Sequence, residues 1–275
     1  MAMKLGIFAK TYKANNVASL FWKIKQHGIG YVHYNMVCSG LSELPLTVPD
    51  DKISAINQQA KEDGITLIGL SATFNMIHPD QSIREEGLKS LETLAKTARA
   101  LGTNFLSICT GTRNPDNKWK WHPDNALPEA WHDLLITLER ALLIADQYDV
   151  ILGVEPEESN VIRNAGLARK LLDEMKSDRL KIIIDPANLF ENADDTTYIN
   201  QLMEEALELL HKDIAMAHAK DRSLDGAFRP AGRGDIDFDF FVNKLKEIGF
   251  EGPVVMHGLE ENEVEKTVSY LRSLM

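Results

Sequence analysis

The chain has 275 residues, of which 44% are hydrophobic and 26% are charged, and its formal net charge at pH 7 is −11. This length and composition match one α/β domain of about 250 residues with a large buried core. The acidic balance disfavours nucleic acid and anionic membranes as partners, since both attract clustered Lys and Arg. It does not exclude an anionic small molecule, for which a few local cations suffice.

The two cysteines, Cys38 and Cys109, can form neither a disulfide framework nor a CxxC redox pair. A reducing compartment is therefore the simplest expectation. The first apolar run is too short for a signal peptide, and no run approaches the ~20 apolar residues of a membrane span. We expect a cytoplasmic protein with no membrane partner.

Short apolar runs of strand type alternate with longer segments of helical period. The expected strands are residues 5–9, 31–35, 65–70, 104–109, 150–155, 180–185, 214–218 and 253–257. The expected helices are residues 14–26, 50–63, 81–101, 126–147, 163–176, 196–211, 237–248 and 261–274. Eight strand–helix units with no segment left over indicate an α/β fold, a single (β/α)8 TIM barrel over residues 1–275.

Ligand-type residues end the last four predicted strands, namely Glu155, Asp185, His218 and His257. Active sites of such barrels lie at the C-terminal ends of the strands, so these side chains should converge. Two carboxylates and two imidazoles suit Mn²⁺, Zn²⁺, Fe²⁺ or Co²⁺ better than Ca²⁺. Each residue alone has a structural interpretation, as a helix cap, a core histidine or a turn residue. Their joint occurrence favours a divalent-metal site.

Two further residues share a strand face with this set. Lys220 follows His218 by two positions and Glu157 follows Glu155 by two, so both should point to the barrel mouth. Lys220 could stabilise an enolate as a catalytic residue, or could lie at the rim with its ammonium in water. Glu157 could bind a substrate hydroxyl or hydrogen-bond Lys220.

The long loop after the fourth strand supplies candidates for substrate binding, because long loops in compact domains tend to be functional. Arg113 and His122 could bind a carboxylate or phosphate of the substrate. Trp119 or Trp121 could stack on a sugar face. The alternative is a lid that its aromatic residues hold in place.

Two other loops add candidates. His78 follows the third strand and should lie near the mouth. Arg229 precedes Gly232 and Gly234, two glycines that would let an anion approach the backbone closely.

Four segments resemble the xylose isomerase-like barrels, whose members include sugar isomerases, ketose 3-epimerases, inosose dehydratases, hydroxypyruvate isomerase and apurinic endonucleases. The segments are Gly153-Val-Glu155-Pro-Glu157, Ile184-Asp185-Pro-Ala-Asn188, His218-Ala-Lys220-Asp221 and Gly232-Arg-Gly234-Asp-Ile-Asp237. The resemblance spans roughly residues 150–260 by motif, and the eight-unit rhythm extends it over the chain.

The resemblance implies that Glu155, Asp185 and His218 are metal ligands. The family's fourth ligand is usually a Glu at the end of strand eight, where this chain has His257. A histidine could still bind the metal, but its presence removes one of the two opposed carboxylate bases of the epimerase relatives. Asn188, a candidate substrate-binding residue, stands where the family often has a His, which argues against the endonuclease branch.

The resemblance therefore implies a metal-dependent isomerase or epimerase acting on a sugar, keto-sugar or polyol, phosphorylated or not. Its reaction would be an enediolate-type proton transfer, with Glu155, Lys220 and His257 as catalytic residues. The alternatives are an inosose dehydratase-like lyase and a non-catalytic sugar-binding barrel. The expected partner is a small sugar-like molecule and not nucleic acid, and assembly into a homo-oligomer is left open.

Overall fold

The structure, a computed structural model, describes residues 3–275; residues 1 and 2 of the expected domain lie outside the described range. Its strands are β1 (Lys4–Phe8), β2 (Tyr31–Tyr34), β3 (Thr66–Ser71), β4 (Phe105–Ile108), β5 (Ile151–Val154), β6 (Leu180–Ile184), β7 (Ile214–Arg222), β8 (Phe228–Pro230) and β9 (Pro253–Met256). Its α-helices are α1 (Val17–Gln26), α2 (Asp50–Asp63), α3 (Gln81–Ala100), α4 (Pro128–Tyr148), α5 (Ala165–Met175), α6 (Thr196–Leu210), α7 (Phe238–Glu247) and α8 (Val264–Leu274). Single turns of 3₁₀ helix follow several strands, at Ala9–Thr11, Met36–Ser39, Pro123–Ala126, Pro186–Asn188 and Glu261–Glu263.

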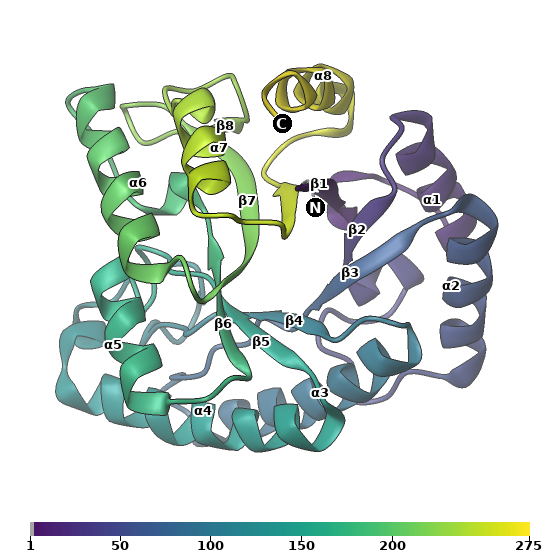
Figure 1. The fold of residues 1–275 in the computed structure, drawn as a ribbon. Helices are drawn as coiled ribbons and strands as arrows, with labels where there is room; N and C mark the ends of the chain where they lie inside the picture. The colour runs from purple at the N-terminus through teal and green to yellow at the C-terminus, as the bar shows by residue number, and fades with distance from the viewer. Residues whose placement is uncertain (1–2) are drawn as a thin grey trace.

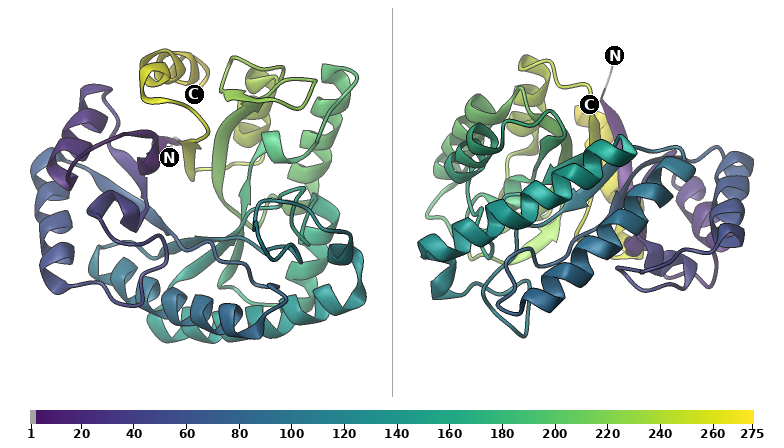
Figure 2. Two further views of the ribbon diagram at one scale, coloured as in Figure 1. Left: turned by 180° about the vertical axis from the view of Figure 1, so that it is seen from behind. Right: turned by 90° about the horizontal axis from the view of Figure 1, so that it is seen from below.

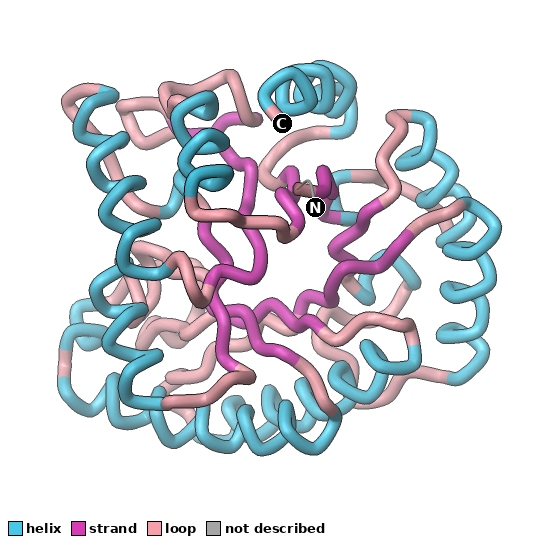
Figure 3. The backbone as a smooth tube through the Cα atoms, viewed as in Figure 1, coloured by secondary structure: helices cyan, strands magenta, loops and turns pink. Residues whose placement is uncertain are grey.

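The parallel strands close into a barrel surrounded by the helices (Figures 1 and 3). Each of β1 to β6 pairs in parallel with the next along the chain, and β9 completes the ring between β7 and β1. The long helices α3 and α4 pack side by side on the outside (Figure 2). The predicted (β/α)8 barrel is confirmed. None of the described helices is both long and apolar enough to cross a membrane.

The seventh strand is longer than predicted and carries an extra pairing. Beyond His218, β7 continues to Arg222 and pairs antiparallel with β8 through Lys220, Asp221 and Arg222. The connecting turn contains Asp225-Gly226, with Gly226 at φ 87°, and Gly226 N donates to Ser223 O at 2.8 Å. An Asp-Gly pair is a strong short-range signal for a hairpin. The hairpin was therefore readable in the sequence, although we had predicted only a loop there.

Most helices begin where a short polar side chain caps the first backbone N–H groups. Asn16, Asn164, Asp195 and Asp237 each accept a hydrogen bond from the N–H three residues later. At the other end of α2, Gly64 adopts the left-handed conformation that terminates helices, with φ 68°. These local signals explain why the predicted helices agree with the observed ones to within a few residues.

An apolar layer fills the barrel interior below its mouth. Phe105, Ile183, Met216 and Val255 form a buried cluster from β4, β6, β7 and β9. Gly153 on β5 has no side chain there, and a Cβ at this position would overlap the Phe105 ring. Successive side chains of a strand alternate between its faces, so the residue two positions later lies above this layer. That residue is His218 on β7, and it is Glu155, Asp185 or His257 directly after β5, β6 or β9.

The loop between β7 and α7 is organised by the buried carboxylate of Asp221. Its two oxygens accept hydrogen bonds of 2.8–3.1 Å from the backbone N–H groups of Arg222, Gly232, Arg233, Gly234 and Ile236. Gly234 packs so closely that a Cβ would overlap Asp221. The backbone N–H groups of Gly232 and Gly234, beside which an anion could approach, are thus engaged by the Asp221 carboxylate of the chain itself.

We predict that Asp221→Asn lowers the free energy of unfolding by about 2–4 kcal/mol, because an amide nitrogen would face backbone donors that it cannot accept from. The measurement is chemical denaturation. Asp225→Asn is the control on the same loop, since exposed Asp225 makes one local hydrogen bond, to Ala227 N, and should shift stability by no more than about 0.5 kcal/mol. Equal effects of the two substitutions would contradict this role for Asp221.

Candidate functional site

A cavity of about 410 Å³ opens above the apolar layer, at the C-terminal ends of the strands. Its floor and walls combine carboxylates, imidazoles and aromatic rings. They are Phe8, Lys10, His33, Glu43, Ser71, Thr73, Ser107, Ile108, Cys109, Trp119, Glu155, Glu157, Glu158, Ser159, Asn188, His218, Lys220, Phe228, His257 and Gly258. Other surface hollows are larger, but this one holds the chemically active residues, as expected for a barrel of this type.

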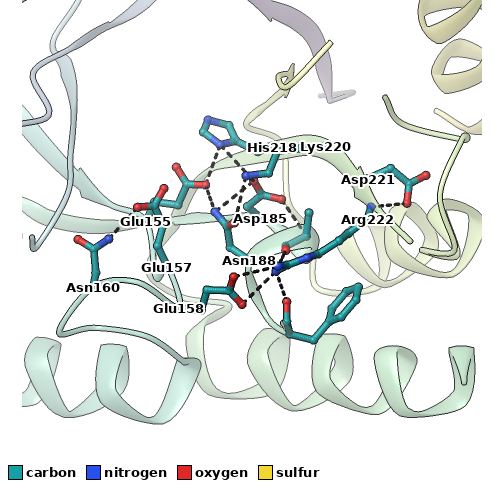
Figure 4. A network of polar contacts seen from close by, with 12 residues as sticks. Glu155, Glu157, Glu158, Asn160, Asp185, Asn188, His218, Lys220, Asp221 and Arg222 are labelled. Atoms are coloured by element: carbon teal, nitrogen blue, oxygen red, sulfur yellow. Dashed lines mark hydrogen bonds and ion pairs between the residues drawn. The ribbon is translucent and has the colours of Figure 1, made fainter. Parts of the chain in front are cut away.

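Three of the expected ligands meet on one side of this cavity (Figure 4). Glu155, Asp185 and His218 each offer one ligand atom, and these atoms lie within 4.8 Å of one another. His218 Nδ1 lies 3.2 Å from Glu155 Oε1 and 3.8 Å from Asp185 Oδ2. The Asp185 side chain is fully buried, whereas 14% of the Glu155 side chain is exposed. Glu155 is therefore the carboxylate that is accessible from the cavity, and Asp185 lies buried behind it.

Asn188 and Lys220 tie the cluster together. Asn188 Nδ2 donates to Glu155 Oε1 at 2.7 Å, and Lys220 Nζ donates to Asn188 Oδ1 at 3.0 Å. Lys220 Nζ also lies 3.2 Å from Asp185 Oδ2 (Figure 4). Its ammonium is packed 4.4 Å from the centre of the Phe228 ring, which comes from β8. The unpredicted hairpin thus holds Lys220 against the carboxylates.

The charges of the cluster perturb one another. Burial opposes ionisation, but His218 and Lys220 lower the pKa of Glu155 well below its usual range. Burial outweighs the attraction of Lys220 and, with the charge of Glu155, raises the pKa of Asp185 to about 6. Glu155 also overcomes the effect of burial on His218, whose pKa is raised. The raised pKa lets the imidazole keep a proton to higher pH, and a metal ion would displace that proton.

Glu157 differs sharply from Glu155 although both face the cavity. Burial, followed by repulsion from Glu155, raises the pKa of Glu157 to about 8. Asn160 Nδ2 donates to Glu157 Oε2 at 2.8 Å. Glu157 is thus mostly a neutral acid at pH 7, able to donate a hydrogen bond to a substrate oxygen.

His257 lies beside the cluster but outside it. Its ring stacks on that of His218, with centroids 5.2 Å apart and planes 11° apart. Because the rings are nearly parallel, the nitrogens of His257 do not point at the same spot as those of His218. Among the described residues, the ligand atoms that lie within 4.8 Å of one another come from Glu155, Asp185 and His218 and not from His257. Burial, followed by the charge of His218, lowers the pKa of His257 well below its usual value. It faces the cavity as a neutral imidazole.

The structure brings some of the other predicted residues to the cavity and leaves others outside. Glu157, Asn188 and Lys220 line it, and Arg229 lines an adjoining groove at its rim. His78 lies 3.1 Å from the Pro115 carbonyl and accepts from Asp80 N, in a neighbouring pocket.

The loop candidates are used elsewhere. Arg113 pairs with Asp133 at 2.7 Å and donates to the Ile77 carbonyl. His122 caps the 3₁₀ turn before α4, and Trp121 lines a separate groove beside α4 and α5. Trp119, the alternative tryptophan of this loop, reaches the cavity.

Sequence reasoning missed the residues contributed by the first two strands. Phe8 and His33 end β1 and β2, and Lys10 and Glu43 follow in the next loops. His33 is likewise a ligand-type side chain near the end of a strand, but it lies within β2 and is followed by Tyr34. Searching every strand for a ligand-type side chain near its end, and not only directly after it, would have found it.

The residues present fit a divalent ion. The converging atoms are two carboxylate oxygens and an imidazole nitrogen, a set suited to transition metals. Asn188 hydrogen-bonds Glu155 and lies 3.5 Å from Asp185 Oδ2, so an outer partner fixes both carboxylates.

We predict that Arg113→Ala lowers the free energy of unfolding by about 1–2 kcal/mol, because it leaves Asp133 and the Ile77 carbonyl short of a partner. KM for any substrate should change by less than about twofold. Thermal denaturation and steady-state kinetics check the two parts. A raised KM with unchanged stability would instead place Arg113 in substrate binding.

Comparisons with solved structures show the same fold in several proteins. A 3-keto-D-glucoside 4-epimerase from E. coli superposes with a TM-score of 0.79 at 17% identity, over 98% of this chain and 99% of that chain. A D-psicose 3-epimerase from Clostridium cellulolyticum H10, solved with D-tagatose, gives a TM-score of 0.74 at 17% identity, over 99% of each chain. IolI protein with a zinc atom gives 0.72 at 17% identity, over 99% of this chain and 96% of that chain.

The sequence itself is similar to an uncharacterized protein of Methanocaldococcus jannaschii, 20% identical over 291 residues, which cover 99% of this chain and 89% of that protein. The family model described as xylose isomerase-like TIM barrel matches residues 21–274. This match takes in all the strands from β2 onward and every residue of the ligand cluster. The chain belongs to the xylose isomerase-like TIM barrel family.

Proposed function

We propose that this protein is a metal-dependent isomerase or epimerase that moves a proton on a carbon beside the carbonyl of a sugar, a keto-sugar or the keto form of a polyol. The observation that carries the proposal is the convergence of Glu155, Asp185 and His218 at the cavity floor. The printed activities of two solved relatives, a 3-keto-D-glucoside 4-epimerase and a D-psicose 3-epimerase, support the substrate class.

A divalent ion held by Glu155, Asp185 and His218 would bind adjacent substrate oxygens and polarise the carbonyl. The side chains around the ion would take different parts in the proton transfer. Glu155 is the ionised carboxylate that faces the cavity, so it is the candidate base. Lys220, a cation held against Asp185, can stabilise negative charge on the substrate oxygen.

His257 is the candidate for a second proton carrier. It is a neutral imidazole on β9, and its Nδ1 is buried without a hydrogen-bond partner. Its stacked position favours this role over that of a fourth ligand. Glu157, a neutral acid, and Asn188 would hold substrate hydroxyls.

A lyase is the alternative with the most structural support. The same enediolate could eject a hydroxyl if an acid protonates it, and protonated Glu157 is such an acid within the cavity. Incubating the metal-loaded protein with keto-sugars, inososes and their phosphates separates the two. Water loss would identify a dehydratase, and an isomeric product an isomerase. Binding without turnover would favour a sugar-binding barrel.

We predict that the protein binds about one divalent transition ion per chain and releases protons as it does so. Affinity should fall below pH ~6, because Asp185 and His218 are then protonated. Calorimetry in buffers of different ionisation enthalpy measures both effects. Asp185→Asn should abolish uptake. Glu43→Gln, which changes a cavity carboxylate paired with Lys10 and outside the cluster, should not. Equal uptake by both variants would contradict the site.

We predict that Glu155→Gln lowers kcat by about 10²–10⁴, the usual cost of losing a general base. Glu157→Gln should leave kcat nearly unchanged, because an amide has nearly the shape of the neutral acid already present at pH 7. It should mainly raise KM, because the hydrogen bond from the acid to a substrate oxygen is altered. Steady-state kinetics at measured metal occupancy compare the variants. Equal losses of kcat at full occupancy would show that Glu155 is not the base.

A further inference from the structure

A row of imidazoles runs along the cavity wall from the ligand cluster to β2. The strands β2, β1, β9 and β7 are neighbours in the barrel, and they carry His33, Phe8, His257 and His218 in that order. Phe8 lies 5.2 Å from the His33 ring and 5.1 Å from the His257 ring, between centroids. His33 lies 6.3 Å from His218. The mechanism uses His218 and His257 but assigns nothing to His33.

His33 is buried with both ring nitrogens unpaired. Its exposed fraction is 2%, and neither Nδ1 nor Nε2 makes a hydrogen bond. The Leu70 carbonyl acts to raise the pKa of His33, but neither ring nitrogen has a hydrogen-bond partner within normal geometry. Buried polar groups in native proteins are nearly always satisfied, so an orphaned side chain in a cavity wall indicates a partner that comes from outside the chain.

The charges around the cavity indicate an uncharged partner. Its lysines are already engaged, since Lys10 lies 2.6 Å from Glu43 and Lys220 lies 3.2 Å from Asp185. Glu158 is paired with Arg222, Glu155 adds negative charge, and one divalent ion would be offset by its own ligands. Burial keeps His33 itself neutral, with its pKa lowered to about 3. Among the described residues that line the cavity, both lysines are paired, so a phosphate on its wall would meet no free cation, and Arg229 lies outside it in the adjoining groove. A hydroxyl can pair with a neutral ring as donor and acceptor.

We propose that His33 is a substrate-binding residue that hydrogen-bonds a hydroxyl of an uncharged, unphosphorylated sugar on the β2 side of the cavity. This inference rests on the proposed function and adds to it the charge of the substrate and a specificity-determining residue.

The test compares His33→Phe with His33→Gln. The first keeps a planar ring without polar atoms, and the second keeps a donor and an acceptor. Without ligand, His33→Phe should raise Tm by about 2–4 °C, because it removes an unsatisfied buried group. With the sugar on which the protein acts, it should raise KM about five- to tenfold with little change in kcat. His33→Gln should recover part of that loss.

Deoxy analogues locate the contact. One deoxy analogue should lack the hydroxyl that His33 binds. Calorimetry should give this analogue the same dissociation constant for the wild type and for His33→Phe. The wild type should bind the free sugar more tightly than its phosphate. His27→Phe is the control, since His27 is a partnered imidazole beside Tyr12 and the Lys23 carbonyl. It should lower Tm and leave KM unchanged.

A structural His33 would behave in the opposite way. If His33→Phe lowers Tm and leaves the affinity for every sugar unchanged, the inference is overturned while the proposed function stands. Tighter binding of the phosphorylated sugar also overturns it. If the metal-loaded wild type neither binds nor converts any sugar, the proposed function falls and this inference falls with it.

Discussion

The alternation of side chains above one apolar layer is the constraint on which the site depends. Phe105, Ile183, Met216 and Val255 close the barrel interior, so the next inward side chain of each strand must face the cavity. Because the layer is apolar and buried, the groups above it lie in a low dielectric. There His218 Nδ1 lies 3.2 Å from Glu155 Oε1.

Placing charges above such a layer requires that they compensate one another. Lys220 lies against Asp185, Asn188 bridges to Glu155, and Arg222 forms a two-pronged pair with Glu158. The proton on His218 further balances the carboxylates. An ion would take over this balancing role from the proton, so metal loading and protonation are alternative ways to satisfy one cluster. The β7–β8 hairpin belongs to the same arrangement, because its Phe228 packs on Lys220.

The sequence predicted what depends on local pattern and missed what depends on distant partners. Strand periodicity and motif placed Glu155, Asp185 and His218, which follow apolar runs directly. The loop residues could not be placed in this way. Arg113 is turned from the cavity by Asp133 on α4, and Asn75 bonds both the N–H and the carbonyl of Thr112. These contacts join segments far apart in the chain, and no local signal specifies them. His33 was missed for another reason, since it lies within β2 and is followed by Tyr34, so it does not stand out as a polar residue directly after an apolar run.

The exchange of a carboxylate for His257 changes how protons can be handled. Two opposed carboxylates repel each other in a buried site, and one must take up a proton unless a cation separates them. Here Glu155, the ionised carboxylate of the cluster, faces a cavity whose other side is lined by the neutral imidazoles of His257 and His33. The two sides of the cavity therefore differ in charge before any substrate arrives. The neutral side is the one that an uncharged molecule can occupy without displacing charge.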